Sequence, residues 1–367
     1  MNKIKFQVRQ YVKMFFQYIL LPFVYQIGKR KEVRKGLIIL ADAHHAEIPD
    51  SMEFFADKLE KRGYEIRKFF FESHGINGIK NMVSFMKSYA EAEYVVLCDY
   101  FLPVASCKKR EETIVVQLWH ACGLLKKCGY STPDDIPPGY RGDMFRNYDL
   151  LTVSGEACRE AMAEAMRLPL EKVQALGVSR TDIFWKKGYQ DSCKEKFYEL
   201  HQEAEGKKIV MWAPTFRGKA SQPYVIGQAE IEYVKEQLGE GYYLLSHLHP
   251  HIQKNQQSIM ELLPVVDILI TDYSSVVYEF ILFEKPIVLF VPDYEEYERT
   301  RGFCIDIKAL PVRWAQTKEE LLAAIRKSYS DKEREEQQKC KKLYMSACDG
   351  HATERILDSI GLTGERK

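Results

Sequence analysis

Short apolar runs alternate with segments of helical spacing along most of this 367-residue chain. Examples of the runs are "GLIILA" (36–41), "YVVLCD" (94–99), "IVMWAP" (209–214) and "KPIVLFV" (285–291). Continuous apolar runs of this length are typical of strands that are buried on both faces, as in a parallel sheet. Strands that alternate with helices predict βαβ units. The sequence therefore predicts an α/β fold of doubly wound parallel sheets.

A polar helical segment, 189–208, separates two such alternating blocks, and the length of the chain suits two domains. We predict a first domain over 36–205 and a second over 206–330. The remaining segments are an N-terminal one, 1–35, and C-terminal helices, 331–367, that pack back across the domains. Sheets of this kind bind ligands beyond the carboxyl ends of their strands, so we expect a site in the cleft between the domains.

The composition excludes some classes of protein. The chain has 53 lysines and arginines and 52 aspartates and glutamates, so it lacks the net positive charge that would attract nucleic acid. The nine cysteines contain no Cys-x-x-Cys pair, which favours free thiols in a reducing compartment over a zinc ribbon or a disulfide framework. No small-residue cleavage site follows the N-terminal apolar stretch, so we expect no secretory signal peptide.

The N-terminal segment combines an apolar, aromatic stretch (14–27) with basic residues on both sides. The flanking cations are Lys3, Lys5, Arg9 and Lys13 before the stretch and Lys29, Arg30, Lys31, Arg34 and Lys35 after it. The stretch is too short to span a bilayer comfortably. Its pattern predicts an amphipathic helix in the interface of an anionic membrane. The alternative is a helix that packs on the protein's own core.

In the second block, a strand ends at Asp272, and Ser274 and Ser275 follow where a helix is predicted to begin. Free N–H groups at a helix start attract anions, so the two serines predict a diphosphate seat. Glu279 lies one turn after Ser275 and could hold ribose hydroxyls. The alternative is a capped helix with nothing bound.

Two further strand ends of the second block carry candidate residues. Thr215 and Arg217 follow the strand at 209–214, and a guanidinium there suits a phosphate, although a plain surface arginine is the alternative. In "LSHLHPHI" (245–252), alternate histidines would share one face of an extended chain, which raises the question of zinc. No acidic or cysteine ligand lies close by, so we favour a single functional histidine, His249.

The stretch "VVQLWHACGLLKKCGY" (115–130) takes a buried strand of the first block directly into His120. A histidine near pH 7 is the usual general base for a hydroxyl nucleophile. Lys126, with Lys127 beside it, could neutralise phosphate oxygens. A structural role is the commoner one for any single histidine, but His, Lys, Arg and Ser at several strand ends together favour a phosphate-handling enzyme.

Six segments of the chain together form a recognisable series of motifs. They are "LWHACGLLKKCG" (118–129), "GVSRTD" (177–182), "WAPTFRG" (212–218), "HLHP" (247–250), "ITDYSSVVYEF" (270–280) and "KPIVLFVPDYEEYERTRGF" (285–303). In this combination and order the chain resembles the CDP-glycerol glycerophosphotransferase family, the primases and polymerases of wall teichoic acid. The resemblance implies a GT-B fold, with two Rossmann-like domains that face a central cleft. It implies a C-terminal domain that holds the CDP donor and an N-terminal domain that holds a prenyl-linked glycan acceptor. It further implies no metal or other cofactor, and a peripheral location at the cytoplasmic face of the cell membrane.

The resemblance also implies roles for matched residues. His120 matches the family's base and His249 its second essential histidine. Arg217, Ser274, Ser275 and Glu279 resemble the family's diphosphate and ribose contacts. From their places in the strand-end loops, we also expect Lys126 at the donor's phosphates and Thr215 and Asp272 at the nucleotide. A Gly-x-x-Arg-x-Asp block, structural or adjacent to the nucleotide, comprises Gly177, Arg180 and Asp182. A block near the donor's distal end comprises Tyr297, Arg301 and Gly302.

One departure from the family pattern bears on function. Many polymerases have His-Gly-Thr-Pro where this chain has His120, Ala121, Cys122 and Gly123, a variant that resembles the branch containing primases. We therefore predict transfer of glycerol phosphate from CDP-glycerol to a prenyl-diphosphate-linked glycan, with release of CMP. The open alternatives are a CDP-ribitol enzyme, a polymerase, a GT-B glycosyltransferase that uses a nucleotide sugar, and a non-catalytic nucleotide-binding protein. A homo-oligomer is also left open.

Overall fold

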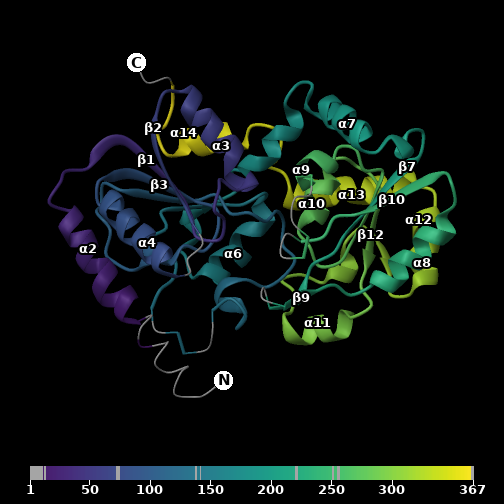
Figure 1. The fold of residues 1–367 in the computed structure, drawn as a ribbon, viewed down its shortest axis with the longest axis horizontal. Coiled ribbons are helices and arrows are strands. Elements are labelled where there is room, and N and C mark those ends of the chain that lie inside the picture. The colour runs from purple at the N-terminus through teal and green to yellow at the C-terminus, as the bar shows by residue number, and fades with distance from the viewer. Residues whose placement is uncertain are drawn as a thin grey trace.

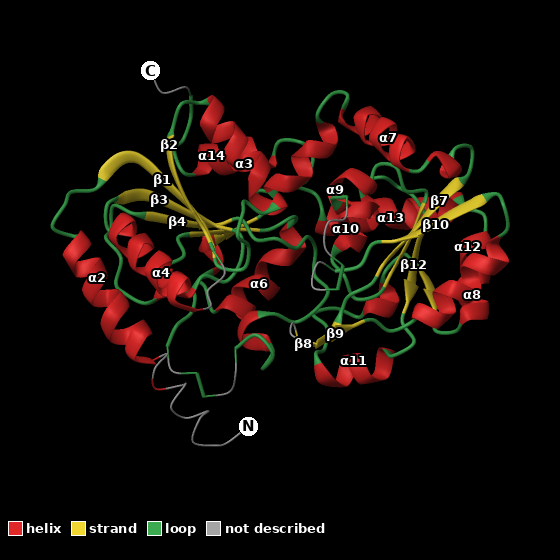
Figure 2. Cartoon of the chain, in the orientation of Figure 1, coloured by secondary structure: helices red, strands yellow, loops and turns green. Residues whose placement is uncertain are grey.

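The computed structural model describes residues 11, 14–71, 75–136, 139–140, 142–219, 222–249, 252–253 and 257–364. These residues form two lobes, each built on a parallel sheet with helices on its faces (Figures 1 and 2). The predicted α/β fold with parallel sheets is confirmed.

The first sheet has the strand order β2-β1-β3-β4-β5-β6, and all of its pairs are parallel. Its strands are β1 (Arg34–Asp42), β2 (Glu65–Phe70), β3 (Ala92–Leu97), β4 (Ile114–Gln117), β5 (Leu150–Thr152) and β6 (Val173–Gln174). Its helices are α3 (Asp50–Lys61), α4 (Gly75–Tyr89), α5 (Leu102–Ala105) and α6 (Arg159–Met166). The continuous apolar runs form the buried centre of the sheet because both of its faces are covered.

The second sheet has the order β10-β7-β11-β12-β13. Its strands are β7 (Lys208–Ala213), β10 (Tyr242–Ser246), β11 (Ile268–Thr271), β12 (Ile287–Phe290) and β13 (Arg313–Ala315). Its helices are α8 (Gln228–Leu238), α9 (Ile259–Leu262), α10 (Val276–Ile281), α11 (Tyr294–Thr300) and α12 (Lys318–Arg326). A hairpin of β8 (Arg217–Lys219) and β9 (Gln222–Tyr224) follows β7. In each sheet the strand order reverses beside the first strand, where this topology binds ligands.

The connecting and C-terminal helices are α7 (Tyr189–Leu200), α13 (Asp331–Tyr344) and α14 (Ala352–Ser359). Helix α7 buries Cys193 and Phe197 in the core of the second domain. Helix α7 therefore packs with the second sheet, and the boundary near residue 205 stays a prediction. Helix α14 returns to the first domain, where Ile356 and Leu357 pack with residues of β1 and β3 beside α3 (Figure 1).

The N-terminal helix consists of a π-helical stretch, Phe16–Leu20, that continues into α2 (Leu21–Gly28). One side packs on α4, and the ring centroids of Tyr25 and Tyr89 lie 5.0 Å apart. This side of the helix therefore packs on the protein's own core, which was the alternative to membrane contact. Other apolar side chains of the segment stay exposed, namely Tyr11, Met14, Phe15, Tyr18, Ile19, Phe23 and Ile27.

The predicted basic flank at Lys3, Lys5, Arg9 and Lys13 lies outside the described residues. Within the part of the chain that the structure describes, no helix has the length and apolar character needed to cross a bilayer. Membrane contact by the N-terminal helix stays a prediction.

Candidate active site

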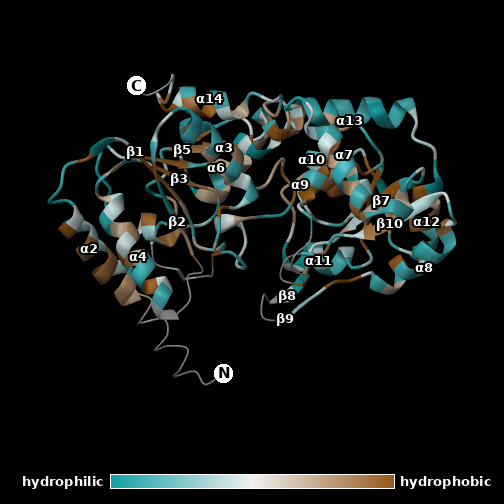
Figure 3. Ribbon diagram, turned by 45° about the horizontal axis from the view of Figure 1, so that its top comes forward, coloured by the Kyte–Doolittle hydropathy of each residue, from teal (hydrophilic) through white to brown (hydrophobic). Residues whose placement is uncertain are grey.

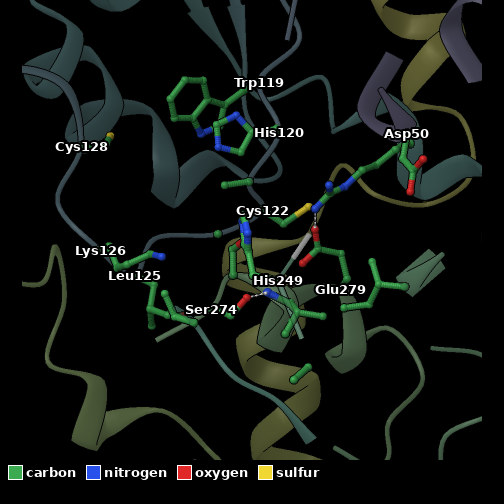
Figure 4. A pocket seen from close by; sticks show the side chains of 18 of the residues that line it. Asp50, Trp119, His120, Cys122, Leu125, Lys126, Cys128, His249, Ser274 and Glu279 are labelled. Carbon is green, nitrogen blue, oxygen red and sulfur yellow. Dashed lines mark hydrogen bonds and ion pairs between the residues drawn. The ribbon is translucent and has the colours of Figure 1, made fainter. Parts of the chain in front are cut away.

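A cavity of about 810 Å³ lies between the two domains. Figure 4 shows Trp119 and His120 on one side of it and His249, Ser274 and Glu279 on the other. The predicted site residues that line it are His120, Lys126, Arg180, Thr215, His249, Ser274, Ser275, Glu279 and Arg301. Six others do not line it: Gly177, Asp182, Arg217, Asp272, Tyr297 and Gly302.

His120 enters the cavity just beyond β4. Its Nδ1 lies 3.1 Å from the carbonyl oxygen of Cys98 and 3.7 Å from Oδ2 of Asp99. Because a carbonyl oxygen can only accept, Nδ1 carries the proton of the neutral ring, which leaves Nε2 with its lone pair. The preceding Trp119 has a left-handed backbone (φ 58°), a rare conformation for a bulky residue and one that clusters at functional sites.

The loop after His120 turns at Gly123, where φ is +62°. A Cβ atom there would lie 2.3 Å from the ring of Tyr278, so only glycine fits. The loop then joins the second domain: Cys304 N–H donates to the carbonyl of Leu125 at 2.8 Å, and Lys126 forms a β-bridge with Phe303. Tertiary packing thus places Lys126 on the cavity wall between the domains.

Lys126 lies in a partly desolvated, cation-rich position. Burial, together with the nearby Arg301 and Arg217, lowers the pKa of its ammonium group to about 8, although Asp272 opposes the shift. A lysine with this pKa changes charge within an accessible pH range.

For the CDP donor that the sequence resemblance implies, we expect the affinity to fall as pH rises above about 8, since Lys126 is charged below its pKa and neutral above it. The dissociation constant of CDP, measured by calorimetry between pH 6.5 and 9.5, checks this. Lys126→Arg is the matched control because a guanidinium stays charged throughout this range. The same decline in wild type and Lys126→Arg would remove Lys126 as its source.

Asp272 connects the loops that follow β7 and β11. Its Oδ1 accepts from the backbone N–H of Thr215 at 2.8 Å and of Tyr273 at 2.6 Å. Ser274 and Ser275 follow directly and face the cavity ahead of α10. The hydroxyl of Thr215 has no hydrogen-bond partner in the described protein. These contacts tie together the two strand-end loops that bring Thr215, Ser274 and Ser275 to the cavity.

The N–H groups of the Arg217 guanidinium donate hydrogen bonds to other groups of the protein. Nε donates to Oδ2 of Asp293 at 2.8 Å, Nη2 to Oδ2 of Asp272 at 3.0 Å, and Nη1 to the carbonyl of Thr215 at 2.8 Å. Its guanidinium also lies over the rings of Tyr273 and Tyr297. In this geometry Arg217 supports the loop that carries Thr215, and the phosphate contact predicted for it stays a prediction.

Arg180 and Glu279 form a buried ion pair in the wall of the cavity. Figure 4 labels Glu279 and marks the interaction of its carboxylate with a dashed line. Glu279 is only 1% exposed, and its Oε2 has no hydrogen-bond partner in the described part of the protein. An unpaired buried carboxylate oxygen is costly, and a ligand hydroxyl would satisfy it. This arrangement is compatible with the ribose contact predicted for Glu279.

The other members of the two matched blocks support the domain arrangement. Asp182 accepts from the N–H groups of Ala352 and Thr353 and so caps α14. Gly177, with φ +96°, allows a close approach to the carbonyl of Ala347. Arg301 spans the domains to Asp135, at 2.8 Å. Tyr297 stacks on Tyr273 with centroids 3.9 Å apart, and Gly302 accepts from Lys127 N–H.

The histidines of the loop after β10 lie in different environments. His247 Nε2 donates to the carbonyl of Gln257 at 3.0 Å, and burial lowers the pKa of His247. His249 lines the cavity, with its ring centroid 4.6 Å from that of Phe216. His251 lies outside the described residues. Among the residues described, no cluster of three or more His, Cys, Asp or Glu could hold a metal, and independence from metal stays a prediction.

Several residues that line the cavity were not predicted from the sequence. Asp50 begins α3 and lies at the cavity, where its Oδ2 accepts from Ser258 Oγ of the other domain at 2.7 Å. Asp99 lies just beyond the carboxyl end of β3. The rule that selected His120, that ligands bind beyond the carboxyl ends of the strands, would also have selected Asp99. Gln257 and Ser258 lie far beyond the end of β10, and no local pattern marks them.

Comparison with known proteins places these observations in a family. Residues 23–362 match the sequence profile of the CDP-glycerol:poly(glycerophosphate) glycerophosphotransferase family. The chain is 29% identical to a teichoic acid poly(ribitol-phosphate) polymerase of Bacillus spizizenii, over 93% of this chain and 58% of the relative, which is less than two thirds of its length. It is 32% identical to a teichoic acid ribitol-phosphate primase of the same organism, over 74% and 75% of the two chains.

The structure is similar to that of the wall teichoic acid polymerase TagF, with a TM-score of 0.76 and 19% identity over 99% of this chain and 98% of that one. This likeness confirms the predicted GT-B fold. The profile match over residues 23–362 shows that the chain belongs to the CDP-glycerol:poly(glycerophosphate) glycerophosphotransferase family.

Proposed function

We propose that the protein transfers glycerol phosphate from CDP-glycerol to a hydroxyl of a prenyl-diphosphate-linked glycan, with release of CMP, in the synthesis of teichoic acid or a capsule-like polymer. The observation that carries this proposal is the cavity between the two domains of this family member. In it, His120 of the first domain faces Ser274, His249 and Glu279 of the second. The primase-like variant after His120 favours addition of a single unit.

In the proposed reaction, the acceptor hydroxyl attacks the phosphorus that bears glycerol, and the bond from this phosphorus to the CMP oxygen breaks. Nε2 of His120 takes the hydroxyl proton. Lys126 and His249 stabilise negative charge on the transferred group, and Ser274 and Ser275 hold the diphosphate. Positioning and fixed electrostatics supply most of the catalysis in phosphoryl transfer.

A second donor, CDP-ribitol, is supported by the two ribitol-phosphate enzymes among the relatives. One assay separates the candidates: purified protein, a synthetic prenyl-linked disaccharide, and CDP-glycerol, CDP-ribitol or UDP-sugars in parallel, with mass spectrometry of the product. One added glycerol phosphate is the expected result. A ladder means a polymerase, a ribitol mass or a sugar mass means another donor, and CDP binding without product means a non-catalytic protein.

We further propose that the exposed apolar side of the N-terminal helix, brown along α2 in Figure 3, rests on an anionic membrane at the cytoplasmic face. Phe23 is 63% exposed and Ile19 58% exposed, and Lys29 and Arg30 follow on the surface. Apolar burial and attraction to anionic lipid together would hold the protein there.

Replacing Ile19 and Phe23 together with glutamate is expected to weaken binding to phosphatidylglycerol vesicles at least tenfold, because it removes apolar burial and adds charge repulsion. Co-sedimentation measures the bound fraction. Leu200→Glu is the matched control, since Leu200 is 68% exposed on the second domain. Equal binding of the double variant and the control would contradict the assignment of this surface.

A further inference from the structure

Gln257 holds a side-chain amide that the protein leaves unsatisfied. Both Nε2 and Oε1 are buried, and neither has a hydrogen-bond partner among the described residues. The side chain lines the interdomain cavity. An unpaired buried amide is costly, so native structures satisfy such groups with protein, water or ligand. Its position at the cavity points to a ligand as the partner.

The backbone around Gln257 is held firmly. Its carbonyl accepts from His247 Nε2 at 3.0 Å. The next residue, Ser258, caps α9 by accepting from Met260 N–H, and its hydroxyl donates to Asp50 in the other domain. A backbone held in this way presents the Gln257 side chain at a defined place in the cavity, which lowers the conformational cost of recognising a ligand.

The surroundings of Gln257 match a nucleoside. Ile259, Met260 and Leu263 form an apolar wall of the cavity next to it in the chain. The same cavity contains the unpartnered Oε2 of Glu279. An apolar wall suits the face of a base, an amide suits its polar edge, and a carboxylate suits ribose hydroxyls.

We propose that Gln257 hydrogen-bonds the polar edge of the donor's pyrimidine base, which makes it a specificity-determining residue; this inference rests on the proposed function. Cytosine presents an amino donor at N4 beside an acceptor at N3. Oε1 accepts from the N4 amino group while Nε2 donates to N3. Leucine at this position offers neither contact, although it fills a similar volume.

The test measures dissociation constants by calorimetry for wild type, Gln257→Leu and the control Gln228→Leu. Gln228 is exposed on α8 and bonds only Glu232 in the described protein. The ligands are CDP and inorganic pyrophosphate, which lacks the nucleoside. Gln257→Leu is expected to bind CDP about tenfold or more weakly and pyrophosphate unchanged, whereas Gln228→Leu should match wild type for both ligands.

Thermal melting of the ligand-free proteins distinguishes the loss of a ligand contact from a loss of folding stability. Gln257→Leu should melt at or above the wild-type temperature, because it removes a buried amide without partners. A lower melting temperature would assign Gln257 a structural role and overturn the inference. So would unchanged CDP affinity, or an equal loss for pyrophosphate. Wild type that fails to bind CDP would instead overturn the proposed function itself.

Discussion

His120→Ala is expected to lower the turnover of CDP-glycerol by about 100- to 10,000-fold, the usual contribution of a general base. The contact of Nδ1 with the Cys98 carbonyl leaves Nε2 as the atom that takes the acceptor's proton. Because every predicted diphosphate and ribose contact except Lys126 belongs to the second domain, and Lys126 is unchanged in this variant, CDP affinity should change by no more than about twofold.

Release of CMP under single-turnover conditions measures the effect on the chemical step, and calorimetry with CDP measures donor binding. His351→Ala is the control, since His351 is exposed before α14 and lies outside the cavity lining. Near-normal CMP release by His120→Ala would show that another group accepts the proton. An equal loss in CDP affinity would show that the ring acts in binding.

Arg180→Ala is expected to destabilise the folded protein by about 3–5 kcal/mol, because it leaves the Glu279 carboxylate buried without its cation. The side chain of Arg180 is 17% exposed and that of Glu279 is 1% exposed, so both charges of the pair are largely removed from bulk water. Chemical denaturation followed by fluorescence checks the change in the free energy of unfolding.

Arg34→Ala provides a matched control, because the Arg34–Glu65 pair is 48% exposed on both sides and exposed pairs contribute about 0–1 kcal/mol. The double variant Arg180→Met with Glu279→Gln should recover much of the stability, since no net charge remains buried. A loss in Arg180→Ala no larger than that in Arg34→Ala would contradict a strong role for the buried pair.

The long strands followed from the sequence because their signal is local. Nearly every residue of β1 and β7 is buried, which requires the continuous apolar runs read at 36–41 and 209–214. The two-residue β6, the three-residue β13 and the β8–β9 hairpin were not predicted, because segments this short carry no measurable period. The helix over 189–200 was predicted, but the domain it packs on was not.

The sequence by itself determined the α/β class and which strand-end loops meet, since parallel strands carry their carboxyl ends to one edge of a sheet. The tertiary structure alone decided which charges pair. Arg217 meets Asp293 across 76 residues and Arg180 meets Glu279 across 99, and no local pattern encodes such partners. It also decided that the N-terminal helix packs one side on α4 and exposes the other. Periodicity is a property of neighbours in the chain, whereas ion pairs and burial depend on neighbours in space.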